Sequence, residues 1–265
     1  MLQQTQVDRV VPLYARFVAR FPSFAALARA DAADVVRAWR GLGYNARAIR
    51  LHALAHAVVA RGGELPHDTD ALLALPGIGP YTAAAVRTFA FGIDDAAIDV
   101  NVRRVVHRVA FGLEHPRRAG TAVIDAIARA AVPAGAGHAW NSAMMDLGAT
   151  VCTARAPRCL VCPLRDACAA APLDPGALSA AARAHAPRRA PQSALPFERT
   201  TRFLRGRIVD RLRDVADGET LALDNLARDL AAVVPHDRLE ELGRAVDALE
   251  RDGIVVNERG AIRLR

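Results

Sequence analysis

The sequence predicts a mainly α-helical protein that ends in a small α+β module. Apolar residues recur at helical spacing from residue 7 to about residue 150. No alternating strand pattern occurs before residue 254, close to the C-terminus. Between these parts, residues 169–196 are mostly Ala, Pro and Arg, which indicates a linker or a loose covering segment.

The N-terminal part contains one helical segment after another. The first periodic set runs from Val7 to Phe21, and Pro12 is expected to bend or divide it, because proline removes a backbone N–H. Further helices are expected at residues 31–40, 46–60, 69–74, 82–91, 101–111, 122–131 and 140–150.

Helical spacing returns after residue 196 and predicts three more helices. Their apolar residues begin at Phe203, Leu223 and Leu239, and Gly253 is placed to end the last helix. Residues 254–256 and 261–264 are expected to pair as a small hairpin. Three helices followed by a hairpin predict a winged-helix-like domain over residues 197–265.

The charge balance points to a polyanionic partner. Lys and Arg total 35 against 28 Asp and Glu, which gives a net charge of +7 and a pI near 10.2. Such a surface favours nucleic acid, although an Arg-rich composition can also reflect a GC-rich genome. No apolar run reaches the roughly 18 residues that a membrane-spanning helix needs, and no secretion signal is recognisable. We therefore expect a soluble, cytoplasmic monomer without a membrane partner.

Four cysteines lie close together and are the only cysteines in the chain. They are Cys152, Cys159, Cys162 and Cys168, with the spacing C-x6-C-x2-C-x5-C. A 265-residue chain with 52% hydrophobic residues can build a core without disulfides, so a metal site is the better interpretation. Zinc normally uses two separated C-x2-C pairs or a mixture of Cys and His. One tight loop of four thiolates instead favours a [4Fe-4S] cluster, with zinc as the alternative.

A glycine-rich turn precedes one of the expected helices. It reads Leu-Pro-Gly-Ile-Gly-Pro-Tyr-Thr over residues 75–82, with Gly77 and Gly79 on either side of one apolar residue. Such a turn lets successive backbone amides and the helix N-terminus face outward together, which favours binding of a phosphate, here one of DNA. A plain turn between two helices is the alternative.

The glycine turn and the cysteine loop together resemble the helix-hairpin-helix signature of the DNA glycosylase superfamily that includes endonuclease III. Finer motifs resemble the adenine DNA glycosylase family, which removes adenine mispaired with 8-oxoguanine or guanine. These motifs are MLQQTQV at residues 1–7, GLGY at 41–44, IDVNVRRV at 98–105 and MMDLGA at 144–149. The resemblance extends from residue 1 to about residue 168.

This resemblance implies a mainly α, two-lobed helix-hairpin-helix DNA glycosylase fold with a cleft between the lobes. Residues 1–95 would form a six-helix barrel lobe with the helix-hairpin-helix, and residues 96–172 a lobe that holds the iron-sulfur cluster. Residues 173–196 would link this core to the C-terminal domain. In many family members that domain is a larger, Nudix-like module that reads 8-oxoguanine, and residues 197–265 are too few to form it.

The resemblance also implies which residues contact double-stranded DNA that carries an A·8-oxoguanine or A·G mispair. Gln4, preceded by Gln3 in the same run, would insert into the duplex beside the flipped base. Thr5, Leu42 and Tyr44 would lie against the opposing guanine or 8-oxoguanine. Each has a structural alternative, as a solvated helix residue or as part of a loop packed on a helix.

Asp99 is the first candidate for catalysis. Hydrolysis of the bond between adenine and deoxyribose builds positive charge on the sugar, which a carboxylate below the ring stabilises in the transition state. The structural alternative is a helix N-cap, a role that is compatible with catalysis. Asn101 would help to orient the site. Asp146 would either reach the adenine pocket, as the resemblance implies, or cap or pair within the cluster lobe.

Tyr81 separates two chemistries. By the resemblance, bifunctional relatives carry a lysine at this position, and its amine forms a Schiff base that leads to strand cleavage. Tyrosine cannot do this, so a monofunctional glycosylase is expected. Tyrosine also occupies this position in thymine glycosylases that act on T·G mispairs, which are the second candidate. The Leu-Gln-Gln-Thr run at residues 2–5 favours the adenine enzymes.

One family residue falls outside the chain. The family's general acid is a Glu two residues before the position of Met1, and Asp8 lies about 13.5 Å and half a helical turn beyond it, too far to replace it. A start codon assigned at an internal Met is the favoured explanation. If Met1 is the true start, the alternative is a catalytically silent iron-sulfur protein that binds DNA.

Overall fold

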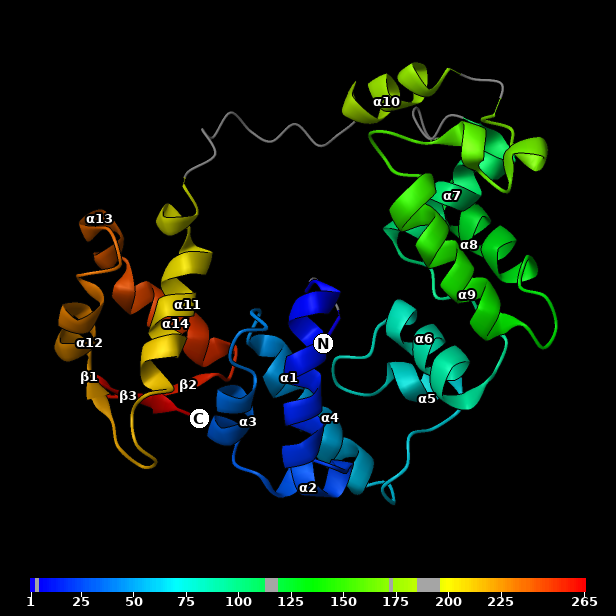
Figure 1. Ribbon diagram of the computed structural model, residues 1–265. Coiled ribbons are helices and arrows are strands. Elements are labelled where there is room, and N and C mark those ends of the chain that lie inside the picture. The colour runs from blue at the N-terminus through cyan, green and yellow to red at the C-terminus, as the bar shows by residue number, and fades with distance from the viewer. Residues whose placement is uncertain (3–4, 113–118, 172–173, 185–195) are drawn as a thin grey trace. The chain divides into compact units, whose positions relative to one another are not determined.

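The computed structural model describes residues 1–2, 5–112, 119–171, 174–184 and 196–265 (Figure 1). The chain divides into two compact units. The first comprises Met1–Leu65, Leu75–Gly77 and Pro191–Arg265, and the second Pro66–Ala74 and Ile78–Ala190. In the described part of the chain, no helix is long and apolar enough to span a bilayer.

The first unit begins with four helices, α1 (Val7–Arg20), α2 (Phe24–Arg29), α3 (Ala32–Ala38) and α4 (Ala46–Val59). Helix α1 continues through Pro12, so the expectation that this proline divides the segment is wrong. Loss of one backbone hydrogen bond is offset by burial of Phe17, whose ring packs edge-on against Trp39 at 5.7 Å. Helix α2 was not expected from the sequence, and the Ser23 hydroxyl caps it by accepting from the amide of Ala26.

The same unit contains the C-terminal elements. These are α11 (Thr201–Leu212), β1 (Leu221–Ala222), α12 (Leu223–Leu230), α13 (His236–Leu239), α14 (Leu242–Arg251), β2 (Val255–Glu258) and β3 (Ala261–Leu264). The strands form an antiparallel sheet in the order β1-β3-β2. The expected helices and hairpin are confirmed, and Gly253, at φ +70°, follows the end of α14. The short β1 and α13 were not expected, because elements of two and four residues are too short to show periodicity.

One hydrophobic core joins the N-terminal helices of the first unit to its C-terminal elements. Val36 and Trp39 from the beginning of the chain share this core with Ile208, Leu249 and Ile262 from its end. All five side chains are at most 2% exposed. The C-terminal elements therefore fold as part of the first unit and are not an appendage to it.

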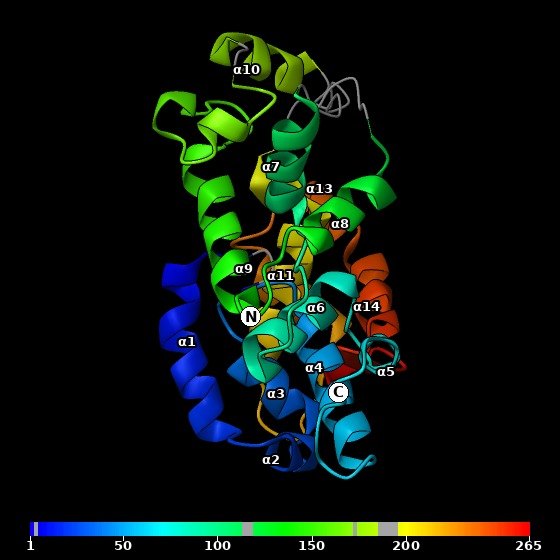
Figure 2. The same cartoon turned by 90° about the vertical axis from the view of Figure 1, so that its right-hand side faces the viewer.

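Over its described residues, the second unit consists of helices and loops and contains no strand. It contains α5 (Thr69–Leu73), α6 (Pro80–Phe91), α7 (Val100–Phe111), α8 (Thr121–Ala130), α9 (Gly137–Asp146) and α10 (Pro175–Ala184). Helix α7 packs against both α8 and α9, as Figures 1 and 2 show. Val102 and Val106 of α7 and Ile124 of α8 form the centre of a small core. A π-helical turn, Leu147–Val151, extends α9 toward the cysteines.

The predicted domain boundaries and these compact units divide the chain at different places. The boundary expected at residue 95 lies inside the second unit, and residues 197–265 belong to the first. Within the expected linker, residues 173–196, the structure describes α10, and its Leu178 is buried beside the cysteines. Helix α10 therefore covers the cysteine pocket. This agrees with the second interpretation of the segment's composition, a loose covering segment. The assignment of lobes and of a winged-helix-like domain stays a prediction.

Candidate functional site

The glycine-rich turn leads directly into α6. Gly77 has φ +77°, and a Cβ there would lie 3.0 Å from the Cβ of Arg50, so both its backbone angle and its surroundings favour glycine. Gly79 is the N-cap of α6, its carbonyl accepts from the amide of Ala83 at 2.8 Å, and Pro80 occupies the first turn. The expected turn is confirmed. Its contact with a DNA phosphate stays a prediction.

Asp99 is the N-cap of α7, and hydrogen bonds hold both oxygens of its carboxylate. Its Oδ1 accepts from the amides of Asn101 at 2.8 Å and Val102 at 2.7 Å. Its Oδ2 accepts from the side-chain amide of Asn101 at 2.8 Å. These three N–H donors hold both oxygens of the carboxylate at the positive end of the helix dipole. The N-cap interpretation is confirmed, and it presents a preorganised negative charge at the helix end.

Buried polar groups fix the chain just before Asp99. The Asn141 side chain accepts from the amide of Ala97 at 2.7 Å and donates to the carbonyl of Asp95 at 2.8 Å. The Asp95 carboxylate, 8% exposed, accepts from Arg87 Nε at 3.0 Å and from the amide of Ala96 at 2.8 Å. Sequence reasoning missed Asn141 and Asp95. A single polar residue in a helix, such as Asn141, or in the segment between two helices, such as Asp95, carries no local signal of its buried partners.

The structure brings Tyr81 close to Asp99. Tyr81 lies in the first turn of α6 and is 36% exposed. Partial burial, followed by the negative charge of Asp99, raises the pKa of the Tyr81 phenol. The phenol is therefore a neutral hydrogen-bonding group beside the carboxylate throughout the physiological range.

Arg104 connects the Asp99 site to the cysteine loop. Its Nη2 donates to the Oδ1 of Asn101 at 3.0 Å and to the carbonyl of Gly148 at 2.8 Å, and its Nε donates to the carbonyl of Cys152 at 2.8 Å. Asn101, held by Arg104 on one side, donates to Asp99 on the other. The side chains of Asn101 and Arg104 thus connect the Asp99 carboxylate to the cysteine loop, so the conformation of the loop affects the orientation of this carboxylate.

Gly148 allows the π-helical turn to approach α7. A Cβ at this position would lie 2.8 Å from the Cβ of Asn101, closer than carbon atoms of folded proteins normally come. Asp146, two residues earlier, ends α9 and is exposed, and its carbonyl accepts from the Thr150 hydroxyl at 2.7 Å. Its expected role in an adenine pocket stays a prediction.

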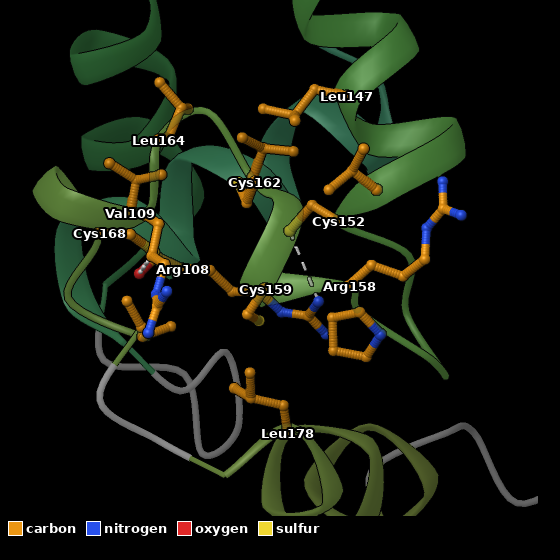
Figure 3. Close-up of a pocket in the computed structure, with 16 residues that line it drawn as sticks. Arg108, Val109, Leu147, Cys152, Arg158, Cys159, Cys162, Leu164, Cys168 and Leu178 are labelled. Carbon is orange, nitrogen blue, oxygen red and sulfur yellow. Dashed lines mark hydrogen bonds between the residues drawn. The ribbon is translucent and has the colours of Figure 1, made fainter.

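All four cysteines line one pocket in the second unit (Figure 3). They come from the loop after α9, and each is a thiol without a disulfide. Burial and the other three cysteines raise the pKa of Cys159. Arg108 of α7 donates to the carbonyl of Thr153 at 2.8 Å and to the Sγ of Cys152 at 3.6 Å. The remaining walls are largely apolar and include Val105, Val109, Leu147, Leu164 and Leu178.

Four cysteine ligands can hold a single zinc ion or an iron–sulfur cluster. Four thiolates around one zinc lie about 2.3 Å from the metal and therefore about 3.8 Å from one another. Among the described residues, no three Cys, His, Asp or Glu side chains are grouped closely enough to hold one metal ion. The cysteines surround a pocket with largely apolar walls that is also lined by Arg108, Arg158 and Arg165, and this lining fits a larger group with four thiolate ligands.

The residues expected to face the opposing base lie in the first unit. The Thr5 hydroxyl donates to the carbonyl of Leu42 at 3.0 Å, and Arg47 donates to the same carbonyl and to Thr5 Oγ1, both at 2.9 Å. The Leu42 side chain is only 2% exposed, which agrees with the alternative that it belongs to a loop packed on a helix. Tyr44 is 39% exposed. Gln3 and Gln4 lie outside the described residues.

Comparisons with known proteins agree with this arrangement. Residues 1–122 match the model of the HhH-GPD superfamily of base excision DNA repair proteins. Over 257 residues, 38% are identical to the adenine DNA glycosylase of Mycolicibacterium smegmatis, with 96% of this chain and 81% of that protein covered. The human adenine DNA glycosylase is 39% identical over 64% of this chain and 32% of its own length.

Solved structures of related enzymes have the same fold. A thermostable thymine-DNA glycosylase superposes with a TM-score of 0.60 at 30% identity, over 64% of this chain and 80% of that one. An endonuclease III trapped on DNA superposes with a TM-score of 0.56 at 24% identity, over 64% and 79%. The second likeness shows the fold alone. With its helix-hairpin-helix turn, its capping Asp99 and its four-cysteine pocket, the chain belongs to the adenine DNA glycosylase family.

Proposed function

We propose that this protein hydrolyses the N-glycosidic bond of adenine in duplex DNA when adenine faces 8-oxoguanine or guanine. Family membership supports the choice of adenine and of base excision repair. The observation that carries the proposed chemistry is the Asp99 carboxylate, which three N–H donors hold in place at the N-terminus of α7.

The role of Asp99 follows from the charge that develops during the reaction. As the bond from the sugar C1′ to the adenine nitrogen breaks, the electron pair leaves with the base and the sugar becomes positive. A fixed carboxylate interacts more strongly with that cation than with the neutral substrate, so it lowers the barrier. A water oxygen then bonds to C1′ and the water gives up a proton, while the leaving adenine takes up a proton at the nitrogen that held the sugar, so the products are free adenine and an abasic site.

The absence of lysine side chains supports a monofunctional reaction. Tyr81 occupies the position where a Schiff-base lysine would be expected, and none of the 265 residues is lysine. The 35 residues in the combined count of Lys and Arg are therefore all arginines, whose guanidinium groups stay protonated. Hydrolysis by water, without strand cleavage, is the chemistry these side chains support.

The four cysteines of the pocket would hold a [4Fe-4S] cluster. One thiolate would bind each iron, from Cys152, Cys159, Cys162 and Cys168. The cluster would then cross-link the loop that carries these cysteines. Arg108 and Arg104 donate to carbonyls of that loop, and Arg104 also donates to Asn101. Ordering of the cysteine loop would therefore favour the orientation of Asn101 and Asp99.

The DNA partner would contact two sets of residues. The turn at Gly77 and Gly79 would bind a phosphate, and Thr5 and Tyr44 would lie against the base opposite adenine. Thymine removal from T·G mispairs is the second candidate, because a thymine-DNA glycosylase is among the structural neighbours at 30% identity. The adenine enzymes match over more of the chain at 38–41% identity, which favours adenine.

The test is Asp99→Asn, because asparagine keeps the cap and removes the charge. Its Oδ1 can accept from the same two amides, so α7 should keep its N-cap. We expect excision of adenine from an A·8-oxoguanine duplex to fall by about a hundredfold or more, since one transition-state stabiliser is lost. Binding to the duplex, measured by fluorescence anisotropy, should be equal or tighter because a negative charge is removed.

A matched control is Asp68→Asn, the same change at the N-cap of α5, where Asp68 accepts from the amide of Ala71 at 2.9 Å. It should leave excision unchanged. Equal rates for Asp99→Asn and the parent protein would overturn the role of Asp99. If the parent excises thymine from T·G duplexes and not adenine, the second candidate is correct. Binding without excision of either base would support the silent DNA-binding protein.

A further inference from the structure

Tyr44 has an unfavourable backbone conformation. It has φ +46°, which is uncommon for a residue with a side chain, and it follows Gly43 at φ +68°. Its ring is 39% exposed. An exposed aromatic ring on a constrained loop is suited to contact a ligand, but only if its orientation is fixed.

Two guanidinium groups contact this ring. The Cζ of Arg202, on the first turn of α11, lies 4.1 Å from the Tyr44 ring centroid. The Cζ of Arg47, on α4, lies 5.5 Å from it. Both distances are within the range of cation–π interactions, and Arg202 makes the closer one.

The same helix also holds the next residue of the loop. Arg213, the C-cap of α11 and 8% exposed, donates to the side-chain oxygen of Asn45 at 2.9 Å and to the carbonyl of Val36 at 3.0 Å. Arg202 and Arg213 are eleven residues apart, about three helical turns, so they lie on one face of α11. That face therefore contacts Tyr44 at one end and Asn45 at the other.

The charge of the C-terminal elements argues against a separate DNA-binding role for them. Residues 197–265 contain 13 Arg and 14 Asp or Glu, a net charge of −1, whereas residues 1–196 carry +8. Many of these arginines pair with acids of the same elements, for example Arg205 with Asp252 and Arg211 with Asp229. A segment without net positive charge gains little from phosphate attraction. Its influence on DNA recognition has to come from what it positions.

We propose that Arg202 is a positioning residue that acts through Tyr44 and sets the preference for 8-oxoguanine over guanine opposite adenine. This inference rests on the proposed function. The Arg202 guanidinium stacks on the Tyr44 ring and holds it where the opposing base is read. The phenol of Tyr44 carries a donor that can meet the extra carbonyl oxygen of 8-oxoguanine, which guanine lacks. The C-terminal elements thereby contribute to lesion recognition without a base-reading domain of their own.

The experiment measures binding, so that it does not depend on turnover. Fluorescence anisotropy gives Kd for duplexes with a central A·8-oxoguanine, A·G or A·T pair, in which 2′-fluoro-deoxyadenosine prevents cleavage of the glycosidic bond. The proteins are the parent chain, Arg202→Ala, Arg202→Lys, Tyr44→Ala and the double variant Arg202→Ala/Tyr44→Ala. Arg211→Ala is the matched control, because Arg211 lies on the same helix and pairs with Asp229 at 2.7 Å.

For Arg202→Ala we expect the ratio of Kd for A·G to Kd for A·8-oxoguanine to fall about threefold to tenfold, the range of one cation–π contact. Arg202→Lys should retain part of the preference, since it keeps the charge without the planar stack. The double variant should lose no more preference than Tyr44→Ala alone, because Arg202 acts through Tyr44. Arg211→Ala should leave the ratio unchanged.

Three outcomes would overturn the inference. One is an equal loss of affinity for all duplexes with a salt slope reduced by about one, which is the behaviour of a phosphate contact. A second is additive loss in the double variant, and a third is an unchanged ratio in Arg202→Ala and Arg202→Lys. If the parent itself does not prefer A·8-oxoguanine or A·G over A·T, the proposed function fails instead.

Discussion

At the scale of single residues, Asp99 combines a structural and a chemical role without conflict. Its Oδ1 satisfies two amides at the N-terminus of α7, which otherwise have no partner within the helix. The same bonds, with that from Asn101 to Oδ2, prevent the carboxylate from rotating. A charge that is already oriented needs no reorganisation as the sugar becomes positive, which is why a capping position is a suitable place for it.

Tyr81 leads to a prediction about covalent trapping. Since no side chain of the 265 residues is a primary amine, borohydride reduction should not link the protein to an abasic-site duplex. Denaturing gel electrophoresis of labelled DNA measures this directly. Tyr81→Lys is the positive control, because it places an amine beside Asp99, and it should give a weak shifted band. A comparable band with the parent protein would contradict the monofunctional reaction.

At the scale of elements, α7 organises the second unit. Asp99 caps its N-terminus, Arg104 lies five residues further on, and Arg108 follows four residues after that. Because residues four apart share a helix face, both arginines reach the cysteine loop, at Cys152 and at Thr153. One helix thus carries residues of both candidate sites of this unit, with Asp99 at its N-terminus and the arginines that contact the cysteine loop further along.

The cysteine pocket gives a prediction about iron. The protein purified without oxygen should be brown and contain about four irons per chain, and Cys159→Ser should lose most of this iron together with solubility and DNA affinity. Iron analysis and the visible spectrum measure it. Leu160→Ala is the neighbouring control, because Leu160 is 78% exposed, and it should keep its iron. Stoichiometric zinc in the absence of iron would show that the cluster assignment is wrong.

At the scale of the whole molecule, the first unit joins the two ends of the chain. Ile208 and Leu249 are packed in the same core as Val36 and Trp39, although more than 160 residues separate Trp39 from Ile208. Arg37 and Arg213 add hydrogen bonds between these parts, to the carbonyls of Val215 and Val36. Removal of the C-terminal elements would expose this core, so they are needed for the stability of the helices that carry Tyr44.

Shared stability can be tested with Ile208→Ala. Ile208 is fully buried, and its truncation should cost about 2–5 kcal/mol in the free energy of unfolding. Fluorescence of Trp39 should report the whole loss, although Trp39 belongs to the N-terminal helices, and Trp140→Phe removes the other tryptophan signal. Val233→Ala, at a side chain that is 53% exposed, is the control and should change little. A Trp39 transition unmoved by Ile208→Ala would mean that the C-terminal elements unfold separately.

The sequence by itself determined most of the helices and the grouping of the four cysteines, while the chemistry of each site stays a prediction. Helical periodicity located most helices, Gly253 marked the end of α14, and the cysteine spacing identified one four-ligand site, because these signals are local along the chain. It missed α2, β1 and α13, which are too short to show a period, and α10, which lies in the segment expected as a linker. The sequence also predicted that Pro12 bends or divides the first helix, whereas α1 continues through Pro12. The burial of Phe17, which offsets the loss of a hydrogen bond, cannot be read from the proline itself.

Only the tertiary structure decided which distant residues meet. The links from Asp99 through Asn101 and Arg104 to the cysteine loop join positions 44 to 48 residues apart, and the contact of Arg202 with Tyr44 spans a far longer separation. Single arginines in a chain with 35 of them carry no signal of their partners. Such contacts depend on how helices pack, since packing alone brings together side chains that no local pattern relates.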